Sequence, residues 1–533
     1  MIKMQYEYDV IIIGGGLLGC FTARNLARYD LKIALLEKRE DLCLGISRAN
    51  TAIVYSGSDT KPGSVKTSMC VKASQGFDEL CAELGVRYSK CGSIMICFGE
   101  RGEGVLRKKL AQANQNGVRG ARLLTREEVL ELEPNISEEV YAGLYVPDTG
   151  TVMPWELCIA AAENAVNNGA RIILNADVTN IERHNDGFIV STAGTTNNTY
   201  HTRAIVNCAG LYADSMLEKV YAPTVRIVPD AGDYFVLDNK VSGFIRHVIF
   251  HEPEEKGKGL TLVPTIEGNI LVGPTERELG VKGQDLGVSD QGSETRVHGT
   301  GDGGADVSDF GFETSLEGME LLRSLVREVV PALPMDQVIR SFGAVRPNPF
   351  EVERARDQGA GGFTARASSD GHDGNFEITL SDKSVNDFCI IEAENDAFIS
   401  FVAVKTPGLT CANELGLYAA DSIAKRLVAA ANKEYDPRRK AQVRLKDMTF
   451  KERESLVCEK PEYGKIVCRC GEITEGEVLD AIRSSPGAAT LDGVKHRAGT
   501  GLGRCQGGFC TQHITELLSR ELGGKPEDYL SKR

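Results

Sequence analysis

A strand, a glycine-rich turn and a helix within residues 8–38 constrain the fold of this chain most strongly. Val10 to Ile13 form a short apolar, β-branched run, which is typical of a buried parallel strand. The sequence G-x-G-x-x-G follows, and Leu17 to Arg28 have helical spacing. Lys32 to Leu36 predict a second strand. The segment therefore predicts a Rossmann-like βαβ unit.

The three glycines of this turn, Gly14, Gly16 and Gly19, suit a dinucleotide site. One makes the tight turn, one lets the backbone approach a pyrophosphate, and one lets helix and strand touch. The helix N-terminus offers N–H groups and the positive end of its dipole to phosphates. Glu37 follows at about the 20-residue distance that suits a ribose hydroxyl. G-x-G-x-x-G alone is a weak signal, but all these parts in register indicate a dinucleotide site.

Length, charge and cysteine content limit the classes of protein that fit. The 533 residues allow about two to four domains with a large core. The net charge of −14 argues against nucleic acid or an anionic membrane surface as a partner. The longest apolar stretch is broken by glycines, so it predicts neither a signal peptide nor a transmembrane helix. Fifteen cysteines without a secretory signal indicate a cytoplasmic protein with free thiols or metal ligands.

The residues after the second strand specify the dinucleotide. Glu37-Lys38, then Ser47-Arg48-Ala49-Asn50-Thr51, then Lys61-Pro62-Gly63 resemble the FAD-dependent oxidoreductases of the glycine-oxidase and glycerol-3-phosphate dehydrogenase group. In that group the Ser/Asn/Thr loop wraps the FAD pyrophosphate and runs under the flavin. Taken alone, small polar residues offer hydroxyls and N–H groups to phosphates, or they form a plain Ser/Asn turn. The resemblance implies FAD contacts at Glu37, Lys38, Ser47, Arg48, Asn50 and Thr51.

The same resemblance implies an α/β fold with a discontinuous Rossmann-like FAD-binding domain and a β-rich substrate domain. Further FAD contacts are implied at Val178, Ala209 and Gly210, and at the helix start formed by Gly408, Leu409 and Thr410. We expect the FAD-binding domain at 1–80, 151–220 and 385–432, a peripheral segment at 81–150 and the substrate domain at 221–384.

Two features stand out within the expected substrate domain. The runs at 259–264 and 268–275 predict a β-hairpin around Glu267-Gly268. The stretches near 280–312 and 353–384 are rich in Gly, Asp and Ser with few large apolar groups. We expect surface insertions or mobile loops there.

Two cations are candidates to hold an anionic substrate. Arg346 lies in Ser341-Phe342-Gly343-Ala344-Val345-Arg346-Pro347, which resembles the family's motif carrying an arginine near the flavin. A guanidinium binds carboxylate or phosphate in a bidentate manner; the alternative is a surface arginine before a proline turn. Lys405 matches a lysine of some relatives and could hold substrate or reduced flavin; the alternative is a solvated loop lysine.

One departure from the family concerns the catalytic base. Where relatives have a histidine in a V-H-A-G-type segment, this chain has Tyr55, and a phenol is a poor base at neutral pH. His247 and His251 lie near the family's active-site strands, so each is a candidate for the base. Both candidates are weak, because an unplaced histidine is more often structural.

The C-terminal region carries a second strong signal. C-x-C and C-x4-C, with about 34 residues and a predicted helix between them, resemble the bacterioferritin-associated-ferredoxin-like [2Fe–2S] domain. Two irons need four thiolates around one small cluster; zinc sites favour C-x2-C, and the compartment disfavours disulfides. The other eleven cysteines suit small core positions. We expect a linker at 433–462, then a small α-helical domain at 463–525 whose ligands are Cys468, Cys470, Cys505 and Cys510.

Together these signals predict an enzyme that removes a hydride and passes single electrons on. The resemblance favours oxidation of glycerol-3-phosphate or an L-2-hydroxy acid such as 2-hydroxyglutarate. The alternatives are an amine or amino-acid dehydrogenase of the same fold, and a non-catalytic electron-transfer or iron-handling protein. We expect a redox partner subunit or a quinone as acceptor; an oligomer, or membrane association through that partner, is compatible with the sequence.

Overall fold

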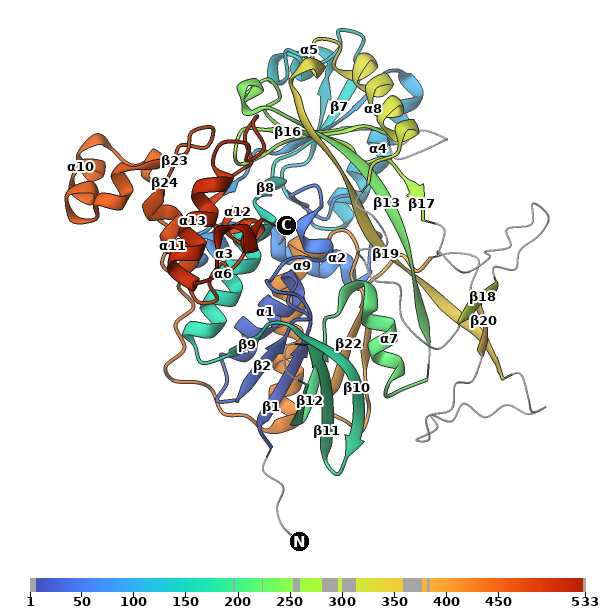
Figure 1. Cartoon of the computed structure of the whole chain (residues 1–533). Helices are drawn as coiled ribbons and strands as arrows, with labels where there is room; N and C mark the ends of the chain where they lie inside the picture. Colours follow the sequence, from blue (N-terminus) through green and yellow to red (C-terminus); the bar gives the residue numbers. More distant parts are fainter. Residues whose placement is uncertain are drawn as a thin grey trace.

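Three bodies make up the fold in the computed structural model (Figure 1). One is built on the N-terminal strand, one is a large, mostly antiparallel sheet above it, and the third is the helical tail beside both. The structure describes residues 6–194, 197–222, 224–252, 259–279, 296–299, 313–357, 376–380 and 384–530.

The first sheet collects strands from three separated parts of the chain. Its central strand β1 is parallel to β2 on one side and to β12 on the other, and β12 is also parallel to β22. The order is β10-β11-β12-β1-β2-β9, with β22 and then β21 branching from β12. The strands are β1 (Tyr8–Ile13), β2 (Ile33–Leu36), β9 (Arg171–Ile173), β10 (Ala176–His184), β11 (Gly187–Gly194), β12 (Asn198–Asn207), β21 (Cys389–Glu392) and β22 (Phe398–Ala403). The predicted discontinuous α/β fold is confirmed.

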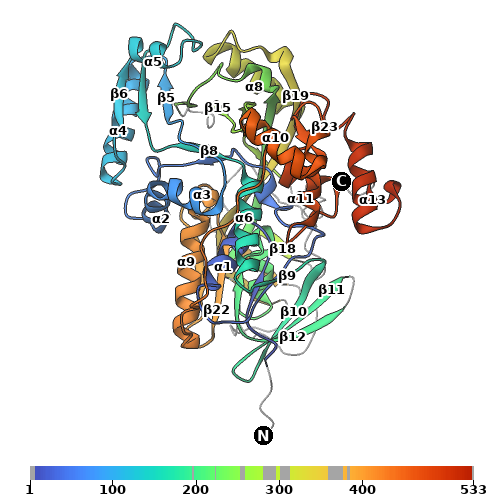
Figure 2. The same cartoon turned by 90° about the vertical axis from the view of Figure 1, so that its left-hand side faces the viewer.

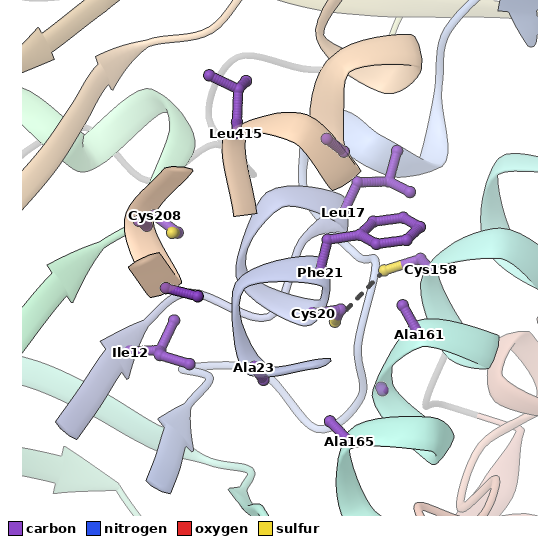
Figure 3. Packing of buried hydrophobic residues seen from close by; sticks show 14 of the residues in the cluster. Ile12, Leu17, Cys20, Phe21, Ala23, Cys158, Ala161, Ala165, Cys208 and Leu415 are labelled. Carbon is purple, nitrogen blue, oxygen red and sulfur yellow. Dashed lines mark hydrogen bonds between the residues drawn. The ribbon is translucent and has the colours of Figure 1, made fainter. Parts of the chain in front are cut away.

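The helix after β1 is buried on nearly all sides. It packs between two other helices, and Figure 3 shows its Phe21 and Cys20 facing Cys158, whose Sγ lies 3.6 Å from that of Cys20. Its polar residues are buried as well, and Arg24 is compensated by an ion pair with Glu83 at 2.6 Å. Burying a side chain such as Phe21 contributes about 1.5–3 kcal/mol to the free energy of unfolding. The helices of this body are α1 (Leu17–Leu26), α2 (Val65–Gln75), α3 (Phe77–Leu84), α6 (Pro154–Asn167), α7 (Ala213–Glu218) and α9 (Gly408–Leu427).

The second sheet forms the upper body. Its order is β18-β20-β19-β13-β16-β15-β14-β5-β7-β6, and β17 pairs with β13. A small sheet, β3-β8-β4, connects the two bodies. The strands are β3 (Ile53–Val54), β4 (Tyr88–Ser89), β5 (Ser93–Cys97), β6 (Arg122–Thr125), β7 (Ala142–Val146), β8 (Gly150–Val152), β13 (Val225–Leu237), β14 (Val248–His251), β15 (Thr261–Pro264), β16 (Ile270–Val272), β17 (Arg277–Glu278), β18 (Arg296–Gly299), β19 (Val338–Asp357) and β20 (Phe376–Leu380). The helices are α4 (Glu100–Gln115), α5 (Arg126–Leu132) and α8 (Leu316–Val329).

The substrate-domain expectations have mixed outcomes. The predicted hairpin is confirmed, because β15 and β16 are antiparallel partners on either side of Glu267-Gly268. Most of the stretches 280–312 and 353–384 lies outside the described residues. Their described parts are strands: β18 and β20 pair with each other, and β20 also pairs with the end of β19. The prediction of surface loops therefore missed these strands.

The tail forms the third body, beside α6 (Figures 1 and 2). Its elements are α10 (Phe450–Glu459), β23 (Ile466–Cys468), β24 (Ile473–Thr474), α11 (Glu475–Arg483), α12 (Leu491–Ala498) and α13 (Thr511–Leu522). Helices α11 and α13 were predicted, whereas α10 lies inside the segment predicted as a linker. A capping box formed by Thr449 and Glu452 starts α10 and is a sequence signal that could have revealed it. In the described part of the chain, no helix is long and apolar enough to cross a bilayer.

Candidate active site and cofactor sites

The glycine-rich turn after β1 has no room for side chains. Gly14 has a φ of +103°, and a Cβ there would lie 2.5 Å from the carbonyl oxygen of Cys208. A Cβ at Gly19 would lie 1.9 Å from the carbonyl oxygen of Gly14, so α1 packs directly on the turn. Gly16 is the N-cap of α1, and the N–H of the next residue donates to Ser47 Oγ at 3.1 Å. The predicted Ser/Asn loop therefore lies at the helix N-terminus, where anions bind best.

Glu37 lies at the end of β2 against the same turn. Its Oε2 accepts from the N–H of Gly15 at 2.6 Å and its Oε1 from the N–H of Arg39 at 2.9 Å. Burial raises the pKa of Glu37, and these two hydrogen bonds oppose that rise. The carbonyl oxygen of Glu37 also accepts from Ala176, which brings the start of β10, and with it Val178, beside the acid. Four sequence-predicted parts of the FAD site thus lie together.

The loop that begins at Ser47 is held in shape by its own polar groups. Asn50 Nδ2 donates to the carbonyl oxygen of Ser47 at 3.0 Å, and Asn50 Oδ1 accepts from Ala52 at 2.8 Å. Trp155 Nε1 donates to the carbonyl oxygen of Arg48 at 2.9 Å. Asn50 therefore shapes the loop rather than only facing a ligand.

Lys38 and the turn at Ala209 and Gly210, which are further predicted FAD contacts, follow strands β2 and β12 of the same sheet. Lys38 Nζ lies 3.9 Å from the ring centroid of Tyr212, in the turn that begins with Ala209 and Gly210. That turn contacts the glycine-rich turn, since a Cβ at Gly14 would lie 3.1 Å from the Cα of Ala209.

Helix α9 begins with Gly408, Leu409 and Thr410, as predicted for a helix that faces the flavin. Thr410 is buried, and its Oγ1 accepts from the backbone N–H of Tyr55 at 2.9 Å. Thr51 Oγ1 lies 3.5 Å from the Tyr55 hydroxyl. The first and third pieces of the FAD-binding domain therefore meet at Tyr55.

Arg346 and Lys405 are joined through two polar residues that the sequence analysis missed. Arg346 Nε donates to Asp230 Oδ1 at 2.5 Å, and Asn348 Nδ2 donates to Asp230 Oδ2 at 2.7 Å. Lys405 Nζ donates to Asn348 Oδ1 at 3.2 Å. Asp230 is 7% exposed and pairs with Arg346 in the β13–β19 register. Lys405 is thus linked to the Asp230 carboxylate only through Asn348, and Arg346 Nη2 also lies 4.0 Å from Glu276 Oε1. Asn348, two residues after Arg346 in an extended strand, was the available sequence signal.

Tyr55 lies among aromatic rings. Its ring stacks on Phe250 with centroids 6.3 Å apart, and nearby Phe342 stacks on Tyr234 at 4.7 Å with an interplanar angle of 6°. Burial raises the pKa of Tyr55, with hydrogen bonding to Thr51 opposing the rise. Tyr55 therefore keeps its proton at neutral pH and can donate a hydrogen bond, but it is a poor base.

The two histidines lie elsewhere. His251 is buried on β14 and packs on Phe98 with ring centroids 5.5 Å apart. Its neighbour Phe250 points to the opposite face, toward Tyr55, because strand side chains alternate. His247 Nδ1 lies 2.7 Å from Glu133 Oε1, a structural contact. His251 thus lies on the face of β14 away from Tyr55 and His247 contacts Glu133, and a role of either as the base stays a prediction.

The four tail cysteines form two close pairs. Cys470 Sγ lies 3.5 Å from Cys505 Sγ, and Cys468 shares a hydrogen bond with Cys510. That bond and the N–H groups of glycines such as Gly501 lower the pKa of Cys468 to about 6, although burial acts in the opposite direction. The same bond raises the pKa of Cys510. Among the described residues no three potential ligands converge as a site for a single metal ion.

Two family models match this chain. One, described as FAD dependent oxidoreductase, matches residues 9–370. This chain belongs to the FAD-dependent oxidoreductase family. The second model, described as BFD-like [2Fe-2S] binding domain, matches residues 466–520 of the same oxidoreductase.

Individual relatives agree with the family. A glycerol 3-phosphate dehydrogenase of Caloramator mitchellensis is 36% identical over 520 residues, which are 97% of this chain and 95% of that protein. An L-2-hydroxyglutarate dehydrogenase of Escherichia coli O17:K52:H18 is 30% identical, over 53% of this chain and 68% of its own length. The structure of L-alpha-glycerophosphate oxidase from Mycoplasma pneumoniae with FAD bound, 24% identical, covers 81% of this chain and 98% of its own with a TM-score of 0.65. That structure shows the shared fold.

The residues of this FAD-dependent oxidoreductase fit both cofactors. The turn at Gly14 and Gly19 leaves room for backbone to approach a pyrophosphate, and Glu37, the predicted ribose contact, lies against this turn. In the tail, a Cβ at Gly503 would lie 2.3 Å from the Cβ of Cys470, so only glycine allows this approach at the thiol. Four thiols in two pairs with backbone N–H donors suit a [2Fe–2S] cluster.

Proposed function

We propose that this oxidoreductase is a dehydrogenase that oxidises glycerol 3-phosphate and passes the electrons to another redox carrier. The observation that carries this proposal is the chain of contacts from Arg346 through Asp230 and Asn348 to Lys405. It places two cations, the guanidinium of Arg346 and the ammonium of Lys405, close together for an anionic group. The near-full-length similarity to a glycerol 3-phosphate dehydrogenase supports the choice of substrate.

When bound, FAD would accept the hydride from the carbon that carries the hydroxyl, the hydroxyl proton would leave to a base or to water, and a [2Fe–2S] cluster would pass single electrons onward. The protein's part is to bind and orient the substrate. In this proposal Arg346 and Lys405 hold the phosphate, and Asp230 keeps the guanidinium in place. Tyr55 donates a hydrogen bond, and the rings of Phe250 and Phe342 exclude water from the space beside it.

A substrate panel without oxygen tests this function. FAD-loaded protein is mixed anaerobically with glycerol 3-phosphate, L-2-hydroxyglutarate, or glycine, and the flavin absorbance is followed. We expect glycerol 3-phosphate to bleach the flavin fastest. Faster bleaching by L-2-hydroxyglutarate would move the assignment to a hydroxy acid, bleaching by glycine alone would move it to an amine donor, and no bleaching would contradict a dehydrogenase role.

A further inference from the structure

A cavity of about 270 Å³, here termed the interdomain cavity, lies where the loop predicted to hold FAD meets the tail. Residues 48–50 of the FAD loop line one side of it, and Phe342 of β19 lines another. The tail contributes His496, Leu502 and Gln506, here termed the tail wall. The cavity therefore belongs to the cofactor region, and the [2Fe–2S] domain borders it on one side.

The course of the FAD loop indicates which part of FAD would reach the interdomain cavity. Ser47 accepts from the first N–H of α1, where the pyrophosphate is expected, and residues 48–50 continue from there into the cavity wall. The pyrimidine end of the flavin is expected at the start of α9, and none of residues 408–410 is among the described lining residues. The cavity therefore suits the opposite, dimethylbenzene edge of the flavin ring.

Gln506 connects the tail wall directly to a predicted cluster ligand. It follows Cys505 in the chain, so a single peptide bond separates a residue of the cavity lining from a ligand. Its side-chain Nε2 donates to the carbonyl oxygen of Gly503 at 2.9 Å, which closes the loop around Cys505. Its φ of +47° is one that residues other than glycine rarely adopt. Strained backbone of this kind concentrates at functional sites.

A second route from the interdomain cavity to the cluster ligands is longer. Trp155 Nε1 donates to a carbonyl oxygen of the FAD loop, and the Trp155 ring lies on that of His496 with centroids 4.6 Å apart. From His496 the chain continues through the end of α12 to Gly501, whose N–H donates to the thiol of Cys468. Electron transfer slows steeply with distance through protein, so the shorter connection at Gln506 is favoured.

We infer that the dimethylbenzene edge of bound flavin lies against the tail wall and that electrons enter the cluster at Cys505 across Gln506. This inference rests on the proposed transfer of electrons from FAD to the cluster. Reduced FAD gives up two electrons, and its protons leave to solvent. The cluster takes the electrons one at a time and passes each to the external carrier before it takes the next. Gln506 is itself neither oxidised nor reduced.

The position of the ring edge is tested without turnover. In 8-chloro-FAD the dimethylbenzene edge carries a chlorine, and a thiolate within reach displaces chloride and forms a thioether bond. Leu502→Cys protein that carries its cluster is reconstituted with 8-chloro-FAD, and we expect a shifted flavin absorbance and a covalent increase in mass. The parent protein and Gln512→Cys, at an exposed position of α13, should form no adduct. Lack of an adduct in Leu502→Cys overturns the inference.

The electron route is tested by reducing the flavin with a light flash in the absence of substrate, so the result does not depend on the substrate panel. Cluster reduction is followed by absorbance and, in frozen samples, by electron paramagnetic resonance. Gln506→Gly suits the positive φ but removes the side chain, and it should slow cluster reduction several-fold. Gln506→Asn should have a rate between those of Gln506→Gly and the parent. Gln512→Ala is the control and should keep the parent rate.

The inference is overturned if both Gln506 variants reduce their cluster as fast as the parent. It is also overturned if His496→Leu slows the reduction more than Gln506→Gly does, because the electrons would then pass through the stack of His496 on Trp155. A parent cluster that stays oxidised beside reduced flavin would instead contradict the proposed function, and the adduct would still report the position of the ring edge.

Discussion

Arg497 and Asp41 form a buried, bidentate ion pair that joins the [2Fe–2S] domain to the FAD-binding domain. The two guanidinium nitrogens lie 2.6 and 2.8 Å from the two carboxylate oxygens, and the side chains are 0% and 1% exposed. A Cβ at Gly493 would lie 2.7 Å from Asp41 Oδ2, so glycine is needed for the approach. Asp41 belongs to the segment that follows Glu37, and Cys43 of that segment donates to the carbonyl oxygen of Gly15. The tail is therefore tied to the segment that builds the FAD site.

Replacing Arg497 by Met should release the tail from the FAD-binding domain. Removing one partner of a buried pair leaves an unpaired charge and costs about 3–5 kcal/mol. We expect an early unfolding transition of the tail and faster proteolysis near residues 433–449, with FAD retained. Arg483→Met is the control, because its pair with Glu521 is half-exposed and worth at most about 1 kcal/mol. Equal effects of the two variants would contradict this role.

Replacing Gly19 by Ala should abolish FAD binding. Its Cβ would lie 1.9 Å from the carbonyl oxygen of Gly14, so α1 would be displaced from the turn. The measurement is FAD content after purification and reconstitution. Gly104→Ala is the matched control: Gly104 lies in α4 with open space around it, and the change should add about 1 kcal/mol of stability. A Gly19→Ala protein that retains FAD normally would show that the close approach is not required.

Stability should fall in acid as Glu267 is protonated. Burial raises the pKa of Glu267, but Arg87, Arg444 and Lys446 more than offset this and hold it at about 2. A lowered pKa contributes stability above the unfolded value of about 4.3, and the contribution is lost as the pH falls toward 2. The loss is on the order of 3 kcal/mol at most for this one group.

Unfolding by urea at several pH values between about 5 and 3 measures this effect. Glu267→Gln should lower stability at pH 5 and flatten the dependence on pH, because the titrating group is gone. Glu139 is exposed, so Glu139→Gln should leave the dependence of stability on pH as it is in the parent protein. A Glu267→Gln slope identical to that of the parent would mean that another group is responsible.

Replacing Arg346 by Ala should raise the KM for the anionic substrate by about a hundredfold, since a charged hydrogen bond is worth ~1.5–3 kcal/mol. FAD content should not change. Asp230→Asn should raise the KM less, because it only loosens the position of the Arg346 guanidinium. Arg346→Lys should restore only part of the lost affinity, because lysine lacks the bidentate geometry. An unchanged KM in Arg346→Ala would remove its assigned role.

Local patterns predicted the parts of this protein that short-range physics determines. The strand ending at Ile13, the glycine-rich turn and the β15–β16 hairpin follow from periodicity and turn chemistry within a few residues. The spacing of the cysteines carried the resemblance to a [2Fe–2S] domain, and the family model confirms that domain.

The parts that were missed depend on contacts between distant segments. Asp41 and Arg497 are separated by 456 positions, and nothing local marks either one as a partner. Asp230 contacts Arg346 across 116 positions for the same reason. His251 was named as a candidate base because its segment lies near the family's active-site strands, and a strand alone does not reveal which of its faces packs toward Tyr55.

The most direct test of the account follows both cofactors of the intact chain during one anaerobic reaction. FAD-loaded protein with its cluster is mixed with glycerol 3-phosphate, flavin absorbance is recorded, and frozen samples are taken for electron paramagnetic resonance. The account predicts flavin bleaching followed by the signal of a reduced [2Fe–2S] cluster. Bleaching with a cluster that stays oxidised, or no bleaching at all, would contradict it.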